Sequence, residues 1–284
     1  MATGGSPTLR RRELGARLRK LRQDAGLTSE EVASRLLCSL TKVSRMETGE
    51  RTATLRDIRD LCQIYEITDP LVREGLNTLA REARQRGWWQ NYEDLGKVTT
   101  LIDLQTAAVS VTEYQTSVVP GLLQTEVYTR AIIRGLLPGI RQETLEERTE
   151  ARLVRQRLLE GEDAPRYWVL LDESVLRRQI GGHVAMKAQL EKLITMADLS
   201  NITIQVIPYE VGAHPGLNSN FTFLEFGEEL IGPVVFVEGL AGDLYLEHRT
   251  DIERYREAIE HLRAVAISPV ESLNFIKKIV ERGA

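Results

Sequence analysis

The chain contains 284 residues, of which 42% are hydrophobic and 27% are charged, and its formal net charge is −4 at pH 7. This length predicts two unequal domains, and the presence of only two cysteines excludes a disulfide framework. No apolar run reaches the roughly 18 residues of a membrane span, so we expect a cytoplasmic protein with no membrane partner.

The chain begins with small and polar residues. Residues 1–9 lack the apolar core of a signal peptide, and we predict that they are disordered. Leu14, Leu18 and Leu21 then recur at i, i+4 and i+7. This periodicity predicts an amphipathic helix, which Gly26 is expected to end.

Residues 27–50 predict two short helices joined by a tight turn. Thr28 and Glu31 have the spacing of a capping box, in which each side chain accepts a hydrogen bond from a free backbone amide of the first turn. A helix should therefore begin at about Ser29. Its predicted inward face is narrow and consists of Val32, Ala33 and Leu36.

The second helix of this pair is predicted to begin after Ser39, a favourable N-cap residue, and to end at a left-handed Gly49. Its predicted buried face consists of Leu40, Val43 and Met46. The opposite face carries short hydroxyls and cations, which suit the major groove because they bond phosphates and base edges. These exposed residues are Ser39, Thr41, Lys42, Ser44 and Arg45.

Two further helices are predicted, and the first of them completes the predicted bundle. Thr54 should cap the first of them, and Asp69 followed by Pro70 is a start signal for the second. The first has a predicted apolar face of Leu55, Ile58, Leu61, Cys62 and Tyr65. We predict a helical linker over residues 69–90, with its end fixed by Trp88 and Trp89.

The pattern over residues 14–67 resembles the lambda-repressor-like helix-turn-helix domain of the XRE class, in which Glu47-x-Gly49 would follow the recognition helix. The resemblance implies a five-helix DNA-binding bundle, which we place at residues 10–68, with residues 39–47 as the recognition helix. It makes the exposed residues of that helix the candidate base readers. The candidate phosphate contacts are Thr28, Ser29, Arg51 and Thr52.

Three residues depart from the family pattern. Leu37 stands where Gly is common, Ser29 replaces the usual Gln, and Ala53 replaces a common Pro. The departures bear on single contacts and on the geometry of the turn.

The distribution of charge supports DNA binding by this part of the chain. Residues 1–68 contain 13 Lys and Arg against 9 Asp and Glu, a net charge of +4. Residues 69–284 contain 24 against 32, a net charge of −8. The positive charge therefore lies where the predicted DNA-binding motif lies.

Residues 91–284 predict an α+β domain with dimerisation and regulation as its expected roles. Helical periodicity covers residues 124–137, 142–159 and 186–199, and β-branched runs predict strands at 167–171, 202–208, 221–226 and 234–237. Two closing helices are predicted from the capping boxes Thr250 with Glu253 and Ser268 with Glu271. The predicted fold is mainly α with a smaller α+β part.

Four stretches of this second region resemble the C-terminal domain of actinobacterial XRE regulators of the Scr1 antitoxin-like type. They are residues 118–131, 152–159, 170–193 and 204–216. The resemblance runs from about Leu14 to the end of the chain. It implies a one-component transcriptional regulator that is commonly paired with a small protein encoded nearby, and it implies no known ligand.

No motif in the sequence predicts an enzyme. The four histidines lack the i, i+4 spacing of a helical metal pair. His214 lies in a glycine-rich loop, where a turn residue is the simpler interpretation, and Asp172 is better interpreted as a helix cap than as a catalytic acid. We expect no catalytic residue, no cofactor and no metal site.

The leading hypothesis is a homodimeric regulator that binds a palindromic operator in double-stranded DNA, because two-fold pairing multiplies the few base pairs that one helix can read. Three alternatives stay open. The chain could be an antitoxin-like module that holds a small partner protein and autoregulates, a regulator that senses a small ligand in an apolar pocket, or a hydrolase.

Overall fold

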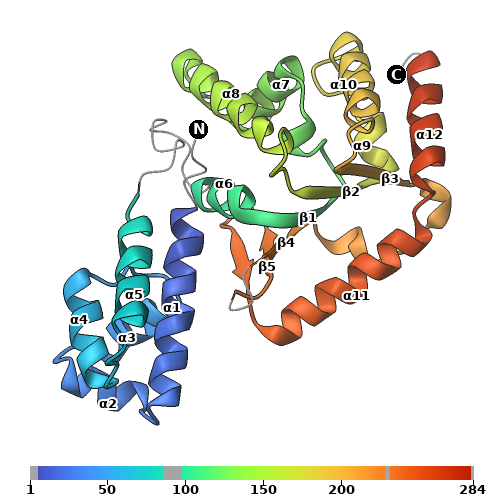
Figure 1. Cartoon of the computed structure of the whole chain (residues 1–284). Helices are drawn as coiled ribbons and strands as arrows, with labels where there is room; N and C mark the ends of the chain where they lie inside the picture. The colour runs from blue at the N-terminus through green and yellow to red at the C-terminus, as the bar shows by residue number, and fades with distance from the viewer. Residues whose placement is uncertain (1–5, 86–97, 228–230, 283–284) are drawn as a thin grey trace. The chain divides into compact units, whose positions relative to one another are not determined.

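The computed structural model describes residues 6–85, 98–227 and 231–282 (Figure 1). Two compact units make up the chain. Unit 1 contains the N-terminal helices, and unit 2 contains a six-stranded sheet with its helices. Helix is the main secondary structure overall.

Unit 1 is a helical bundle built on local start and stop signals. Its helices are α1 (Pro7–Asp24), α2 (Ser29–Arg35), α3 (Leu40–Glu47), α4 (Leu55–Ile64) and α5 (Pro70–Glu82). The predicted caps Thr28, Ser39, Thr54 and Asp69 are confirmed, since each side chain accepts a hydrogen bond from a first-turn amide. Gly26 follows α1 with a left-handed φ of 69° and ends it as predicted.

The core of unit 1 joins all five helices. Its buried members include Leu14, Leu18, Val32, Val43, Met46, Ile58, Leu61, Leu76 and Leu79. Helices α2, α3, α4 and α5 have 7 to 13 residues and are at best marginally stable alone in water, so this shared core is what stabilises them. The predicted buried faces are confirmed for most residues, and Leu21 and Leu36 are partly buried against the core. The exceptions are Leu40 and Leu55, the first residues of α3 and α4, which are 44% and 40% exposed.

Two predicted boundaries of this region are wrong. Residues 6–9 are ordered, because Ser6 caps α1 and Pro7 is its first residue, whereas disorder was predicted for residues 1–9. Residues 1–5 lie outside the described residues. Helix α5 contributes Leu76 and Leu79 to the core, so it is the fifth helix of the bundle rather than part of a linker. The end of the predicted linker, with Trp88 and Trp89, lies outside the described residues.

A sixth helix, α6 (Val98–Ala107), belongs mainly to unit 1. Asp103 of α6 accepts a hydrogen bond of 2.5 Å from the backbone amide of Thr8 in the first turn of α1. Burial raises the pKa of Asp103, while its hydrogen bonds from Ser6 and Thr8 oppose that rise. The contact therefore links two segments that are 95 residues apart in the chain.

Unit 2 is built on a mixed sheet with the strand order β3-β2-β1-β4-β5-β6. Its strands are β1 (Ala108–Gln115), β2 (Arg166–Asp172), β3 (Ile202–Ile207), β4 (Phe221–Phe226), β5 (Val234–Val237) and β6 (Leu244–Leu246). Strands β1, β2 and β3 are parallel neighbours, and β4, β5 and β6 are added antiparallel. The four predicted strands are confirmed, and β1 and β6 were not predicted.

Helices cover both faces of this sheet (Figure 1). They are α7 (Glu126–Leu136), α8 (Gln142–Gln156), α9 (Glu173–Arg177), α10 (His183–Met196), α11 (Arg249–Val265) and α12 (Pro269–Glu281). Short 3-10 turns lie at Gly121–Leu123, Arg157–Leu159, Tyr209–Val211 and Pro215–Asn218. The predicted cap of α12 by Ser268 and Glu271 is confirmed. That of α11 is wrong, because α11 begins at Arg249 after His248, with no side-chain cap.

Adjacent residues of β1 point to opposite faces of the sheet. Tyr114 packs in the apolar cluster that contains Ile259 and Leu262 of α11. Glu113 accepts a hydrogen bond of 2.6 Å from the hydroxyl of Tyr167.

Across the described ranges, no helix has the length and apolarity to cross a bilayer.

Candidate nucleic-acid interface

Helices α2 and α3 form the two-helix motif that the sequence predicts. At the start of α2, Thr28 Oγ1 accepts from the amide of Glu31 at 3.2 Å, and Glu31 Oε2 accepts from the amide of Thr28 at 2.8 Å. At the start of α3, Ser39 Oγ accepts from the amide of Lys42 at 3.2 Å. The hydroxyls of Thr28 and Ser39 are thus engaged in capping, which limits them as hydrogen-bond acceptors for other groups.

The turn between α2 and α3 contains a residue in the left-handed conformation. Leu37 has φ of 51°, a region that side chains other than Gly rarely adopt, and its side chain is 93% exposed. Although Leu stands where Gly is common in the family, the turn keeps its left-handed geometry. The strained backbone of Leu37 costs about 1–2 kcal/mol.

An ion pair fixes the C-terminal end of α3 to α1. Arg22 donates two hydrogen bonds to the carboxylate of Glu47, at 2.7 and 3.0 Å, and a third to the carbonyl of Leu27 at 2.8 Å. The hydrogen bonds with Glu47 raise the pKa of Arg22. Such bidentate pairs have a fixed geometry, so Glu47 orients α3 relative to α1.

Two glycines let α1 approach the same end of α3. Gly49 has φ of 75°, and a Cβ atom there would lie 2.9 Å from Cα of Arg12. A Cβ atom on Gly15 would lie 2.6 Å from the carbonyl oxygen of Met46. These two positions and the Glu47 ion pair give the Glu-x-Gly signature a structural role in holding α3 on the bundle.

The outer face of α3 carries Thr41, Ser44 and Arg45, all of which are exposed. Val43 and Met46 are buried on the opposite side, so the bundle holds the helix by one face and leaves the other to solvent. Arg45 lies 3.5 Å from Glu50, and both side chains are more than 60% exposed. An ion pair this exposed is weak and leaves Arg45 able to exchange Glu50 for another acceptor.

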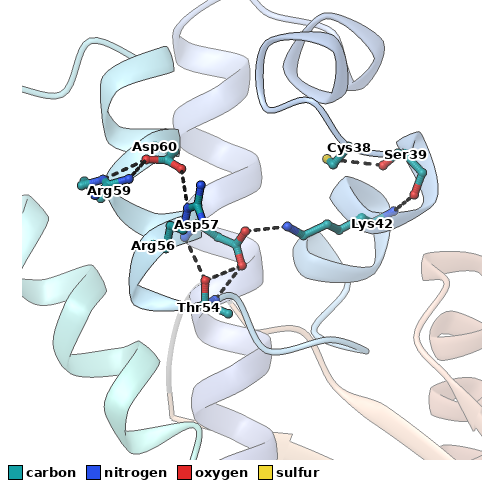
Figure 2. A network of polar contacts seen from close by, with 8 residues as sticks. All are labelled: Cys38, Ser39, Lys42, Thr54, Arg56, Asp57, Arg59 and Asp60. Atoms are coloured by element: carbon teal, nitrogen blue, oxygen red, sulfur yellow. Dashed lines mark hydrogen bonds and ion pairs between the residues drawn. The ribbon is translucent and has the colours of Figure 1, made fainter.

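Lys42 has a different environment from the rest of α3 (Figure 2). Its Nζ atom lies 2.6 Å from Oδ1 of Asp57, and only 24% of its side chain is exposed. Asp57 Oδ2 in turn accepts hydrogen bonds from the amide and the hydroxyl of Thr54. Burial tends to raise the pKa of Asp57, but the hydrogen bonds from Lys42 and Thr54 outweigh it, so that pKa lies below its ordinary value.

The network around Asp57 links α3 to the cap of α4 (Figure 2). Sequence reasoning placed Lys42 on the open face and missed Asp57 as its partner. The two residues are 15 positions apart, and no local pattern pairs them.

The candidate phosphate contacts lie at both ends of the motif. Thr28 is exposed and Ser29 is half-buried at the start of α2. Arg51 is exposed and Thr52 is half-buried after α3. The amide of Arg51 donates to the carbonyl of Arg45 at 2.9 Å, so the segment after Gly49 folds back on the end of α3.

A polar network in unit 2 is centred on Gln124. Gln124 is almost fully buried, and its side-chain oxygen accepts from Arg152 at 2.8 Å. Its backbone carbonyl accepts from Gln156 and from Lys192, both at 2.7 Å. Three separate stretches of the sequence, at 118–131, 152–159 and 170–193, therefore meet at one residue. Satisfied buried networks of this kind favour one unique arrangement of their helices.

The candidate chemical residues of unit 2 have structural environments. Asp172 caps α9 by accepting from the amide of Ser174 at 2.9 Å, which confirms the predicted role. His214 is buried, with Nε2 3.7 Å from Asp172 Oδ2, and its ring packs edge-on against Tyr114. Within the described part of the chain, no group of three His, Cys, Asp or Glu residues could hold a metal ion.

Two known families match the chain. Residues 13–75 match a family described as a helix-turn-helix domain, which covers α2 and α3. Residues 98–278 match a family described as a domain of unknown function, DUF5753. No curated protein and no solved structure matches the chain at a significant level. The helical motif of unit 1 is thus a helix-turn-helix domain by both its geometry and its family.

Proposed function

The chain belongs to the DUF5753 family, and we propose that it is a sequence-specific transcriptional regulator that reads the major groove of double-stranded DNA with α3. The helix-turn-helix domain supports DNA binding. We further propose that it is a one-component cytoplasmic regulator of the XRE class with no enzymatic reaction of its own. This class assignment rests on the resemblances of residues 14–67 and of the second region.

The observation that carries the proposal is the division of α3 into a fixed face and an open face. Val43, Met46 and Glu47 hold the helix on the bundle. Thr41, Ser44 and Arg45 stay exposed on it. Hydroxyls and Arg are suited to phosphate oxygens and base edges, and Arg can pair with guanine through two hydrogen bonds.

Pairing of two copies completes the proposal. One recognition helix contacts only a few base pairs, and a two-fold dimer places two such helices about 34 Å apart on one side of the duplex. We propose that unit 2 provides the dimer contact and receives the regulatory signal, and that the operator is palindromic.

A second candidate function is an antitoxin-like role, in which the chain holds a small partner protein and regulates its own expression. The observation that favours it is the net charge of −8 on residues 69–284, which suits a basic partner. Copurification from cells distinguishes the two, because a regulator without this role is recovered with DNA and without a stoichiometric small protein.

Substitution of Arg45 tests the DNA-binding proposal. With an operator selected from random duplexes by the full-length protein, we expect Arg45→Ala to cost about 1–3 kcal/mol of binding free energy and to relax the preference for one base pair. The matched control is Arg59→Ala, because Arg59 is a similarly exposed arginine on α4 and pairs with Asp60 as Arg45 pairs with Glu50.

Fluorescence anisotropy at fixed salt concentration measures the affinity of both variants for the selected duplex. If Arg45→Ala binds with the affinity and base preference of the Arg59→Ala control, α3 is not the helix that reads the DNA. A duplex affinity that does not depend on sequence would refute the regulator itself.

A further inference from the structure

A partly exposed apolar side chain lies at the edge of the outer face of α3. Leu40 is the first residue of α3 and is 44% exposed, although its apolar character predicts burial. Leu40 is therefore not one of the buried residues that form the core of unit 1, unlike Val43 and Met46 of the same helix. Removing this side chain should therefore cost the bundle less than removing Val43 or Met46.

Leu40 has a definite position relative to the polar residues of the outer face. Ser44 follows it by four residues, which places the two side chains next to each other on one side of the helix. Helical side chains also lean toward the N-terminus of their helix, so Leu40 projects over the start of α3. In a recognition helix, the N-terminal residues are those that contact base edges.

We propose that Leu40 determines specificity by contacting the C5 methyl group of a thymine in the operator. The inference rests on the proposed function and specifies one base that α3 recognises. In the major groove, thymine alone among the four bases presents a methyl group, and an apolar side chain is its natural partner. Thr41, Ser44 and Arg45 supply hydrogen bonds to neighbouring groups, while Leu40 supplies the contact that they cannot make.

Replacement of single thymines by uracil tests this contact, because uracil lacks only the methyl group. With the selected operator, we expect one thymine in each half-site at which uracil weakens binding of the full-length protein about fourfold, the effect of burying one methyl-sized group. In Leu40→Ala, the same replacement should have no effect, because the side chain that meets the methyl group is absent.

Leu55→Ala is the matched control. Leu55 is the first residue of α4, is 40% exposed and is likewise absent from the packed core, but it lies outside α3. This variant should keep the full effect of uracil. Thermal unfolding of both variants should match that of the unaltered protein, which separates loss of contact from loss of fold.

The possible results distinguish this inference from the function on which it rests. If the protein binds its operator specifically but no uracil replacement weakens binding, or if Leu40→Ala keeps the uracil effect, the thymine contact is refuted and the regulator stands. If no operator can be selected at all, the proposed function itself fails.

Discussion

Replacing Leu37 by Gly should stabilise unit 1. The side chain of Leu37 is 93% exposed, so its removal takes almost nothing from the core, while the left-handed φ of 51° is relieved. Relief of this strain contributes about 1–2 kcal/mol. Gly also has greater conformational freedom in the unfolded chain, which lowers the free energy of unfolding by about 0.4–1 kcal/mol. From the middle of each range, the net gain that we expect is about 0.8 kcal/mol in the free energy of unfolding.

Hydrogen exchange of the full-length protein measures this change at the motif itself. Amides of α2 and α3 that open with unit 1 should exchange about two- to fivefold more slowly in Leu37→Gly. The control is Leu37→Ala, which shortens the side chain but keeps the Cβ atom responsible for the strain. Glu66, at φ of 57° after α4, gives an independent repeat of the test with Glu66→Gly. Equal protection in Leu37→Gly and Leu37→Ala would show that left-handed strain is not the cause.

Two other predictions concern the packing of α3. Gly49→Ala should destabilise unit 1 by more than about 1 kcal/mol in urea unfolding, because the new Cβ atom would meet Cα of Arg12 at 2.9 Å in a left-handed conformation; unchanged stability would contradict this. The pKa of Asp57 lies below its ordinary value, so the carboxylate stabilises the folded state above that ordinary value and loses this contribution as the pH falls through the lower folded value. Unfolding between pH 2 and 6 should therefore depend less on pH in Asp57→Asn, and an unaltered dependence would exclude this role.

Local signals in the sequence were sufficient to predict most of unit 1. The capping box of Thr28 and the helix cap by Thr54 act within four residues, and both are formed as predicted; Asp57 makes the second also a capping box. The pairs Arg22–Glu47 and Lys42–Asp57 were missed because they join residues 25 and 15 positions apart. Such pairs depend on how helices pack, which no spacing within a single helix reveals.

The central strand of unit 2 was missed for a related reason. Strand β1 contains Thr112, Glu113 and Gln115, which do not form an apolar or alternating run. Glu113 is tolerated in the interior because Tyr167 of the neighbouring strand donates a hydrogen bond to it, and burial raises its pKa. The partner that permits this polar strand is 54 residues away.

Leu40 was predicted to be buried but is partly exposed. Its spacing from Val43 and Met46 predicts burial, but the bundle turns the first residue of α3 partly to solvent. Helical periodicity identifies which residues share a side of a helix. It does not show how far the neighbouring helices extend along that side.

Selection of duplex DNA from a random library by the full-length protein tests the central claim most directly. The account predicts enrichment of one palindromic site whose half-sites are centred about one helical turn apart. It also predicts that selection with Arg45→Ala enriches a site with one relaxed position per half. Recovery of no enriched sequence, or of the same unrelaxed site with Arg45→Ala, would contradict recognition of DNA by α3.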